Sequence, residues 1–361
     1  MTQQQHSHRI DIHHHFYAPE YLAAMGDTGR RPVVRDWTVG RSLEEMDRNG
    51  VGTAVLSLSP PGLHHLGKEA TRRLERTVNE YAATLRATHR ARFGHFASVP
   101  MPDVDDTLAE IAYALDTLKA DGIQLMTSYG ERYPGHADFT PVMAELNRRN
   151  ALVFVHPLAP VCCAPSLHWI QPALFEFTQD TNRCVFSVLL SGTLARFPDI
   201  RFIFCHSGAA VPTLAGRAGT LGVSRAFAEQ MPNGIDHELR KLHYDVALQA
   251  DRPALAALFA YVPMSQVLLG SDYPFGSSTD GIRGLEAYGL APGDLEAIYR
   301  GNAERLLTGV GPFARRVVVN GHSGGDRADG EQIRELAVRS EGGYNADAID
   351  LQRMRRARRK G

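Results

Sequence analysis

The sequence is short of several residue types, and each shortage excludes a class of protein. Four cysteines in 361 residues, without the spacing of a disulfide framework, favour a reducing, cytoplasmic setting. No apolar run approaches the roughly 20 residues of a membrane span, and residues 1–8 lack the apolar core of a signal peptide. A formal net charge of −1 argues against electrostatic binding of nucleic acid. We therefore expect neither a membrane nor a nucleic acid as a partner.

Histidine, in contrast, is abundant, with 16 residues in the chain, and three of them stand together near the amino terminus. The segment Asp11-Ile12-His13-His14-His15 is flanked by apolar residues, as a short strand would be. Alternate side chains of a strand share a face, so Asp11, His13 and His15 point one way and His14 the other. Neutral imidazole is the commonest protein ligand for a divalent transition metal. We predict that His13 and His15 bind a metal, that Asp11 orients one of them, and that His14 faces away.

Eight short apolar runs, separated mostly by helical patterns, organise the chain. Several are nearly continuously hydrophobic, which is typical of parallel strands buried on both faces. Eight alternations of strand and helix predict an α/β fold of the (β/α)8 TIM-barrel type, with a doubly wound open sheet as the alternative. The expected strands are Arg9–His15, Val51–Ser59, Arg92–Pro100, Gly122–Ser128, Ala151–Pro157, Arg201–Ser207, Leu242–Leu248 and Gln266–Pro274.

Helical periodicity and capping residues indicate several of the intervening helices. The pattern predicts helices over Thr71–Arg90 and Asp103–Ala120, and Asp103 is a suitable N-cap. A third helix is expected over Thr140–Asn150, with Thr140 as its N-cap and a proline at the first helical position.

The composition divides the chain into two parts. We expect residues 1–310 to form the metal-dependent barrel, with long connections at 16–40 and 158–180 building the mouth of its active site. Residues 311–361 are polar and end in a basic cluster, which predicts a partly disordered extension with a short helix at Glu331–Arg339.

Polar residues close several of the predicted strands. His156 ends the fifth strand, His206 the sixth and Asp272 the eighth. The carboxyl ends of barrel strands meet at the face that carries catalysis, so these residues should converge with His13 and His15. One metal would take His13, His15, His156 and Asp272, and it would keep positions open for water or substrate.

These motifs resemble the amidohydrolase superfamily, whose first strand carries Asp-x-His-x-His. The matching segments are Ile-Asp-Ile-His-His-His-Phe, Val-Phe-Val-His-Pro, Phe-Cys-His-Ser-Gly-Ala and Leu-Gly-Ser-Asp-Tyr-Pro-Phe, and the likeness covers about residues 9–310. The branch resembled most is the amidohydrolase-2 group of aminocarboxymuconate-semialdehyde decarboxylase and related non-oxidative decarboxylases. Within it, the segment Asp36-Trp37-Thr38 and residues 46–52 look most like the 6-methylsalicylate decarboxylases.

The resemblance implies that His13, His15, His156 and Asp272 are metal ligands and that His206 is a catalytic residue beside them. Superfamily members with two metals bridge them with a carboxylated lysine on the fourth strand, where this chain has no lysine, so a single metal follows. Zn²⁺ suits two or three imidazoles with a carboxylate, and Mn²⁺ is the alternative. The resemblance also suggests a homodimer or larger homo-oligomer.

The predicted activity is the decarboxylation of a small aromatic acid of the salicylate type. A metal would orient the substrate as a Lewis acid, and Asp272 or His206 would handle the proton at the ring carbon. The same groups would suit a hydrolase of an amide, lactone or ester, which is the alternative. A barrel without catalytic activity, whose basic tail binds a partner, is the third interpretation.

Four further residues are candidates for substrate contact. Trp37 and Phe275 could pack against an aromatic ring, His168 could reach the site from its long connection, and Arg183 could pair with a substrate carboxylate. For each of these residues, ordinary packing or a surface ion pair is the competing interpretation.

Overall fold

The centre of the molecule is a parallel sheet of eight strands that follow one another in chain order. The computed structural model describes residues 8–26, 31–162 and 171–307. Backbone hydrogen bonds join the first strand to the segment after the last one: Ile12 N–H donates to Leu269 O (3.0 Å) and His15 N–H to Tyr273 O (2.8 Å). These bonds close the sheet into a barrel. The strands are β1 (Arg9–His15), β2 (Val51–Ser57), β3 (Phe93–Ser98), β4 (Gly122–Met126), β5 (Leu152–His156), β6 (Arg201–Phe204), β7 (His243–Asp245) and β8 (Val267–Leu268).

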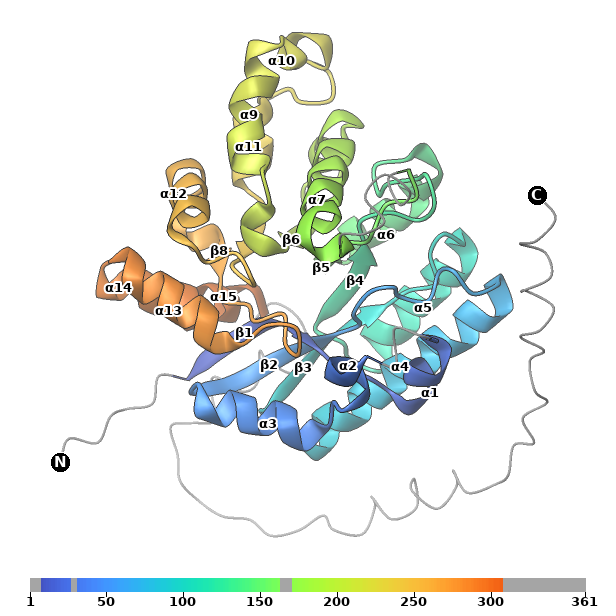
Figure 1. Cartoon of the computed structure of the whole chain (residues 1–361). Helices are drawn as coiled ribbons and strands as arrows, with labels where there is room; N and C mark the ends of the chain where they lie inside the picture. The colour runs from blue at the N-terminus through green and yellow to red at the C-terminus, as the bar shows by residue number, and fades with distance from the viewer. Residues whose placement is uncertain (1–7, 27–30, 163–170, 308–361) are drawn as a thin grey trace. The chain divides into compact units, whose positions relative to one another are not determined.

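Helices connect successive strands and lie around them, with the strands gathered at the centre (Figure 1). The α-helices are α1 (Pro19–Ala24), α2 (Pro32–Arg35), α3 (Val39–Arg48), α4 (Lys68–Thr88), α5 (Val104–Asp116), α6 (Thr140–Arg148), α7 (Pro172–Leu190), α8 (Thr193–Arg196), α9 (Val211–Thr220), α10 (Val223–Ala226), α11 (Ile235–Arg240), α12 (Arg252–Tyr261), α13 (Ser278–Tyr288), α14 (Pro292–Glu296) and α15 (Asn302–Leu307). Short turns of other helix types are η2 (Ala137–Phe139), η3 (His206–Gly208), η4 (Met264–Gln266) and η5 (Ala297–Gly301).

The predicted barrel is confirmed, but its later strands are shorter than the apolar runs. The ladder of β8 contains only Val267 and Leu268, whereas a strand was expected over Gln266–Pro274. Beyond the ends of the β8 and β6 ladders the chain turns through left-handed residues, since φ is +59° at Asp272 and +57° at His206. An L-residue in that region cannot continue a strand. Both side chains therefore project from turns beyond the ends of β8 and β6.

The helix predictions hold with shifts at the ends. Asp103 is the N-cap of α5, and its carboxylate accepts the N–H of Asp106 at 3.0 Å. Thr140 is not the cap of α6, because the turn η2 runs directly into this helix and makes Phe139 the N-cap. The helix α4 begins at Lys68, three residues before the expected start.

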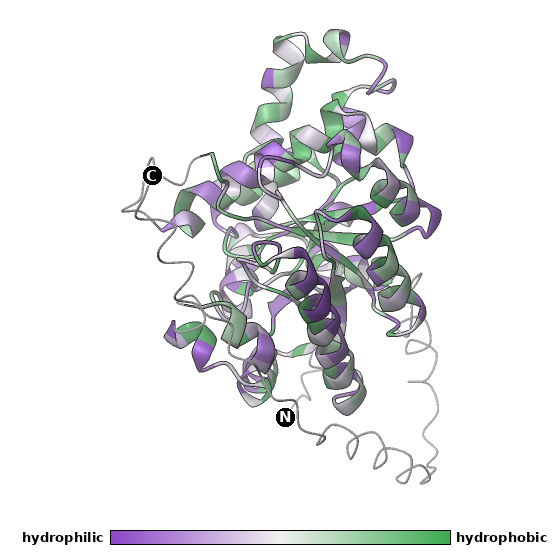
Figure 2. Ribbon diagram, turned by 90° about the vertical axis from the view of Figure 1, so that its right-hand side faces the viewer, coloured by the Kyte–Doolittle hydropathy of each residue, from purple (hydrophilic) through white to green (hydrophobic). Residues whose placement is uncertain are grey.

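Apolar side chains fill the barrel beneath its carboxyl-terminal end and the layer between strands and helices. Phe96 and Phe154 stack inside, with ring centroids 5.1 Å apart. Phe154 shares a face of β5 with His156 and lies 5.0 Å from the ring of His13. At the opposite end Leu307 and its neighbours in α15 belong to the same buried cluster. Figure 2 shows hydrophobic strands surrounded by helices of mixed polarity. The residues predicted for the metal site thus lie above a packed apolar layer.

Two predictions fall wholly or partly beyond the described residues. The extension 311–361, with its short helix at Glu331–Arg339, lies outside them, and the connections 16–40 and 158–180 are each described in part. The described parts include α1 and α2 in the first connection and the start of α7 in the second. Among the described helices, none combines the length and apolar character that a bilayer crossing requires.

Candidate metal centre

The structure brings the five predicted metal-site residues together at the carboxyl-terminal end of the barrel. His13 and His15 come from β1, His156 ends β5, His206 opens η3 and Asp272 follows β8. All five are buried, with exposed fractions between 0% and 6%. Residues from four elements far apart in sequence therefore share one small volume.

The Nε2 atoms of three imidazoles, those of His13, His15 and His206, lie close to the carboxylate oxygens of Asp272. The Nε2 atoms of His13 and His15 are 3.3 Å apart, and they lie 3.4 and 2.9 Å from Oδ1 of Asp272. The Nε2 atom of His206 lies 3.3 Å from the other oxygen, Oδ2. Ligand atoms of His13, His156, His206 and Asp272 all fall within 4.8 Å of one another.

These atoms fit one divalent cation. The Nε2 atom of His156 is buried without a hydrogen-bond partner among the described residues, which costs free energy unless something takes its lone pair. Two Nε2 atoms pointing at each other can share only one proton, whereas a cation between them would use both lone pairs. Imidazole nitrogen with carboxylate oxygen is a donor set that zinc and neighbouring metals accept.

The charge states of His15, His156 and Asp272 suit a metal. Burial lowers the pKa of His15, and burial together with His15 and His13 lowers the pKa of His156 well below its ordinary value. Burial alone would raise the pKa of Asp272, but His13, His15 and His206 hold it well below the usual range. Neutral imidazoles and an ionised carboxylate are the forms that coordinate metals. His13 differs, because burial lowers its pKa but Cys205, Asp245 and Asp272 together hold that pKa well above its ordinary value, so a metal would have to displace a proton from this ring.

Each histidine of the proposed ligand set has an acceptor at its Nδ1 atom, which leaves Nε2 to face the centre. These contacts are His13 Nδ1 with Asp245 Oδ2 (3.0 Å), His15 Nδ1 with Ser57 O (3.2 Å) and His156 Nδ1 with Pro157 O (2.9 Å).

The carboxylate that contacts Nδ1 of His13 was not predicted. Asp11 was expected to orient a ligand, but its Oδ2 atom accepts from His14 Nδ1 (3.0 Å) and from the Ser271 hydroxyl (2.6 Å). Its contact with His13 is a hydrogen bond from the backbone N–H of that residue and does not involve the ring. Asp245 of β7 takes the expected place. Its position as the one carboxylate within the seventh apolar run was a signal that sequence reasoning could have used.

His14 lies on the opposite side of β1 from the centre, as the alternation predicts. Its ring stacks on Tyr273 at 4.7 Å, and its two nitrogens contact Asp11 and Ser42 (Nε2 to Oγ, 3.1 Å). The residue therefore ties β1 to the last barrel segment and to α3.

A model of the amidohydrolase family matches residues 10–308 of the chain. The chain belongs to the amidohydrolase family. This confirms the resemblance that its strand-end motifs indicated.

Individual relatives of this amidohydrolase are similar over most of its length. The decarboxylase yanB of Aspergillus niger is 36% identical over 322 residues, which cover 83% of this chain and 87% of the relative. The 6-methylsalicylic acid decarboxylase of Penicillium expansum is 35% identical over 281 residues, covering 74% and 85%. A solved 5-carboxyvanillate decarboxylase of Novosphingobium aromaticivorans, with bound manganese, superposes with a TM-score of 0.77 at 20% identity over 85% of this chain and 99% of that one. This last likeness shows the shared fold.

Of the residues predicted for substrate contact in this amidohydrolase, Phe275 lies beside the candidate metal centre. Its ring lies edge-on to His15, with centroids 6.0 Å apart. Trp37 is buried behind Tyr17 (5.8 Å), and its indole N–H donates to Ser42 Oγ at 3.0 Å. Trp37 is thus part of the packed layer behind the site.

The described part of the structure supports no substrate contact for the other two candidates, Arg183 and His168. Arg183 lies on α7, where its Nη1 atom is 3.9 Å from Asp180 Oδ1, a spacing that suits the competing interpretation of an ion pair within the helix. His168 lies outside the described residues.

Two residues near the centre were missed by sequence reasoning. The exposed guanidinium of Arg31 lies 5.6 Å from the ring centroid of Phe275. The buried Tyr17 interacts electrostatically with Asp272 and Arg31, and burial raises its pKa above the ordinary range. Neither position carries a pattern in the sequence, because both belong to an irregular connection that only the fold places over the barrel mouth.

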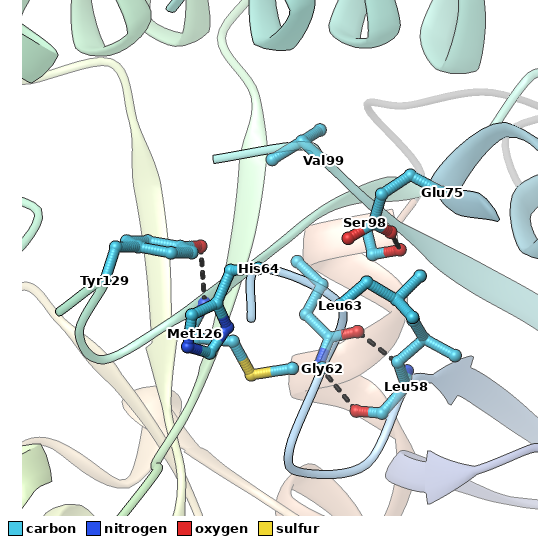
Figure 3. Close-up of a pocket in the computed structure, with 10 residues that line it drawn as sticks. Leu58, Gly62, Leu63, His64, Glu75, Ser98, Val99, Met126 and Tyr129 are labelled. Atoms are coloured by element: carbon cyan, nitrogen blue, oxygen red, sulfur yellow. Dashed lines mark hydrogen bonds between the residues drawn. The ribbon is translucent and has the colours of Figure 1, made fainter. Parts of the chain in front are cut away.

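A separate small pocket lies where β2, β3 and β4 end, and its lining includes none of the five metal-site residues. Figure 3 shows the carboxyl of Glu75 beside the Ser98 hydroxyl, with His64 on the opposite wall. Burial raises the pKa of Glu75 to about 8, so this acid is neutral at physiological pH. The lining residues are Leu58, Gly62, Leu63, His64, Glu75, Ser98, Val99, Gln124, Met126 and Tyr129.

Proposed function

We propose that this amidohydrolase is a metal-dependent, non-oxidative decarboxylase of a small aromatic acid of the salicylate type. The observation that carries the proposal is a cluster of histidines and Asp272, among the described residues, that could hold one metal, in a chain whose relatives at 34–36% identity are named decarboxylases. On β4 the residue facing the neighbouring backbone is Gln124, which donates to Leu58 O and accepts from Leu58 N–H, both at 2.7 Å. No lysine of β4 is present to bridge a second metal.

The two oxygens of Asp272 contact different histidines, which suggests a separate role for each oxygen. His13 and His15 both turn to Oδ1, while His206 contacts Oδ2. We therefore assign His13, His15, His156 and Asp272 to the metal, and we assign His206, with Oδ2 of Asp272, to the proton. Because His206 shares the Asp272 carboxylate with His13 and His15, its proton would lie next to the residues that would hold the metal.

The reaction consumes one proton and releases carbon dioxide. When bound, a divalent metal supplies Lewis acidity to the carboxylate and ortho-hydroxyl oxygens of the substrate. The Asp272–His206 pair delivers a proton to the ring carbon that bears the carboxylate, and a ring electron pair forms the new C–H bond. The C–C bond to the carboxylate then breaks, and its electron pair restores the aromatic ring.

Residues at the mouth would recognise the rest of the substrate. The face of Phe275 can pack against the aromatic ring at the site. Arg31, whose guanidinium lies 5.6 Å from the ring centroid of Phe275, can pair with an anionic oxygen of the substrate. An acid without an ortho-hydroxyl group would lose one of two chelating oxygens and should be a poor substrate.

The metal proposed is Zn²⁺, because three imidazole nitrogens and one carboxylate oxygen match its preferred ligands. Mn²⁺ is the alternative, and elemental analysis of the purified protein followed by reloading of the metal-free chain separates the two. A homo-oligomeric state and a cytoplasmic location stay predictions from the sequence.

The test is carbon dioxide release from metal-loaded protein given salicylate, 6-methylsalicylate or 2,6-dihydroxybenzoate, with para-hydroxybenzoate as the matched control. We expect release from the ortho-hydroxylated acids alone and, in heavy water, one deuterium at the ring carbon that lost the carboxylate. Asp272→Asn should abolish release, whereas Glu110→Gln, a buried carboxylate on α5, should retain it. No release, combined with turnover of a panel of lactones or amides, would replace this proposal with the hydrolase alternative.

A further inference from the structure

Asp245, the carboxylate at the end of β7, contacts both halves of the site at once. Its Oδ2 atom lies 3.0 Å from Nδ1 of His13. Its Oδ1 atom accepts the backbone N–H of His206 at 3.0 Å and that of Ala247 at 2.9 Å. Asp245 and His13 are fully buried, so these contacts do not compete with water.

These contacts determine which nitrogen of His13 carries a proton. The two backbone N–H groups can only donate, and their hydrogen bonds to Oδ1 favour the ionised form of Asp245. The remaining oxygen then requires a donor, which must be the Nδ1–H of His13. In the neutral ring, the form that binds a metal, the lone pair of His13 is therefore on Nε2, the atom that faces His15 and Asp272.

The same carboxylate holds the turn that carries His206. The backbone of His206 has a φ of +57°, in the left-handed region that costs free energy for a residue with a side chain. The hydrogen bond from its N–H to Asp245 Oδ1 stabilises this turn. In that conformation Nε2 of His206 reaches Oδ2 of Asp272 at 3.3 Å.

We propose that Asp245 is a positioning residue that sets the tautomer of His13 for metal binding and fixes the backbone of His206 for proton transfer. The proposal rests on the metal role of His13 and the proton role of His206 assigned above. It predicts that one substitution on β7, a strand that supplies no metal ligand, weakens the metal site and slows proton transfer.

The test variant is Asp245→Asn, which keeps the shape of the side chain. Three donors surround this position, and asparagine has one acceptor oxygen and one NH₂ donor group. Whichever way the amide turns, its NH₂ group faces either His13 or the two backbone N–H groups. An NH₂ group facing His13 favours the tautomer with hydrogen on Nε2, which cannot bind a metal through that atom.

We expect the dissociation constant for Zn²⁺ alone, measured by competition with a chromophoric chelator, to rise about 10- to 100-fold in Asp245→Asn. The matched control is Glu110→Gln, which removes another buried carboxylate, one that pairs with Arg76 at 2.8 Å on the outer layer of the barrel. This control should lose stability and keep the wild-type affinity for Zn²⁺. A folded Asp245→Asn protein with wild-type Zn²⁺ affinity would overturn the proposal.

A measurement on the unaltered chain tests the same idea without depending on the folding of a variant. In the Zn²⁺-loaded protein with ¹⁵N-labelled histidine, the His13 signal, identified by its loss in His13→Gln, should show a proton bonded to Nδ1. A bare or metal-bound Nδ1 atom contradicts the proposal. If Zn²⁺ affinity and this signal behave as expected but no acid is decarboxylated, the role of Asp245 stands and the proposed reaction fails.

Discussion

His95 on β3 should make the protein sensitive to acid. Its side chain is fully buried, and neither ring nitrogen has a hydrogen-bond partner among the described residues. Burial, reinforced by Arg86, lowers the pKa of His95 from 6.5 to about 3. The folded protein therefore holds this imidazole neutral over a pH range in which the unfolded chain protonates it.

The size and sign of the effect follow from the difference between the two pKa values. A histidine whose folded pKa is lowered contributes its full stability above the unfolded pKa and loses it as the pH falls toward the folded pKa. Each pH unit below about 6.5 costs about 1.4 kcal/mol. Between about pH 7.5 and about pH 5, His95 should therefore lower the free energy of unfolding by about 2 kcal/mol.

The perturbation is His95→Leu, which replaces the imidazole by an apolar side chain of similar volume. Denaturant unfolding of the metal-free wild type and variant would be compared at about pH 7.5 and about pH 5, which cancels every other titrating group common to both. The variant should gain about 2 kcal/mol relative to wild type on acidification. His237→Leu, at an exposed position on α11, is the matched control. An unchanged difference between wild type and His95→Leu at the two pH values refutes the reasoning, since the site would then accommodate the imidazolium.

Three further outcomes follow from the site and its surroundings. Glu75→Gln should gain about 2 kcal/mol of stability relative to wild type between about pH 6 and about pH 8. The reason is that an acid whose folded pKa is raised loses stability as the pH rises from its unfolded pKa to its folded pKa. A difference in unfolding free energy between the two proteins that is the same at both pH values would contradict this. Arg31→Met should lower kcat/KM for the aromatic acid about 10- to 100-fold, with partial recovery in Arg31→Lys, and an unchanged value would remove Arg31 from the substrate site. His206→Gln should bind Zn²⁺ normally by elemental analysis yet lower kcat about 100- to 10,000-fold, and loss of the metal instead would make His206 a ligand.

The order of the strands and the main histidines could be predicted from the sequence because both depend on local patterns. A buried parallel strand is a continuous apolar run, so the positions of all eight strands could be predicted from the hydropathy pattern along the chain. The alternation of side chains along β1 placed His13 and His15 on one face and His14 on the other. The carboxyl ends of barrel strands share one face, which was enough to group His156, His206 and Asp272 with them.

The geometry of the site was decided by contacts between residues far apart in the chain. His13 and Asp245 are separated by 232 positions, and no local pattern of charge or hydropathy marks such a pair. Asp11, the nearer carboxylate, was the reasonable choice from spacing, yet it binds His14 and Ser271. The left-handed turn at Asp272, which directs one oxygen to His13 and His15 and the other to His206, likewise has no signal in the sequence.

The scarcity of cysteine, of long apolar runs and of net charge restricted the protein to a globular class, and the strand-end histidines indicated a metal enzyme. Periodicity and residue type are properties of neighbouring positions, so the sequence by itself determined the barrel and the kinds of ligand it offers. Closure of the barrel then brought β7 and the turn after β8 within hydrogen-bond distance of β1, and it brought the ring of His156 on β5 to 5.0 Å from the ring of His13. Only that closure decided which carboxylate contacts which imidazole, because hydrogen bonds act over about 3 Å and depend on direction.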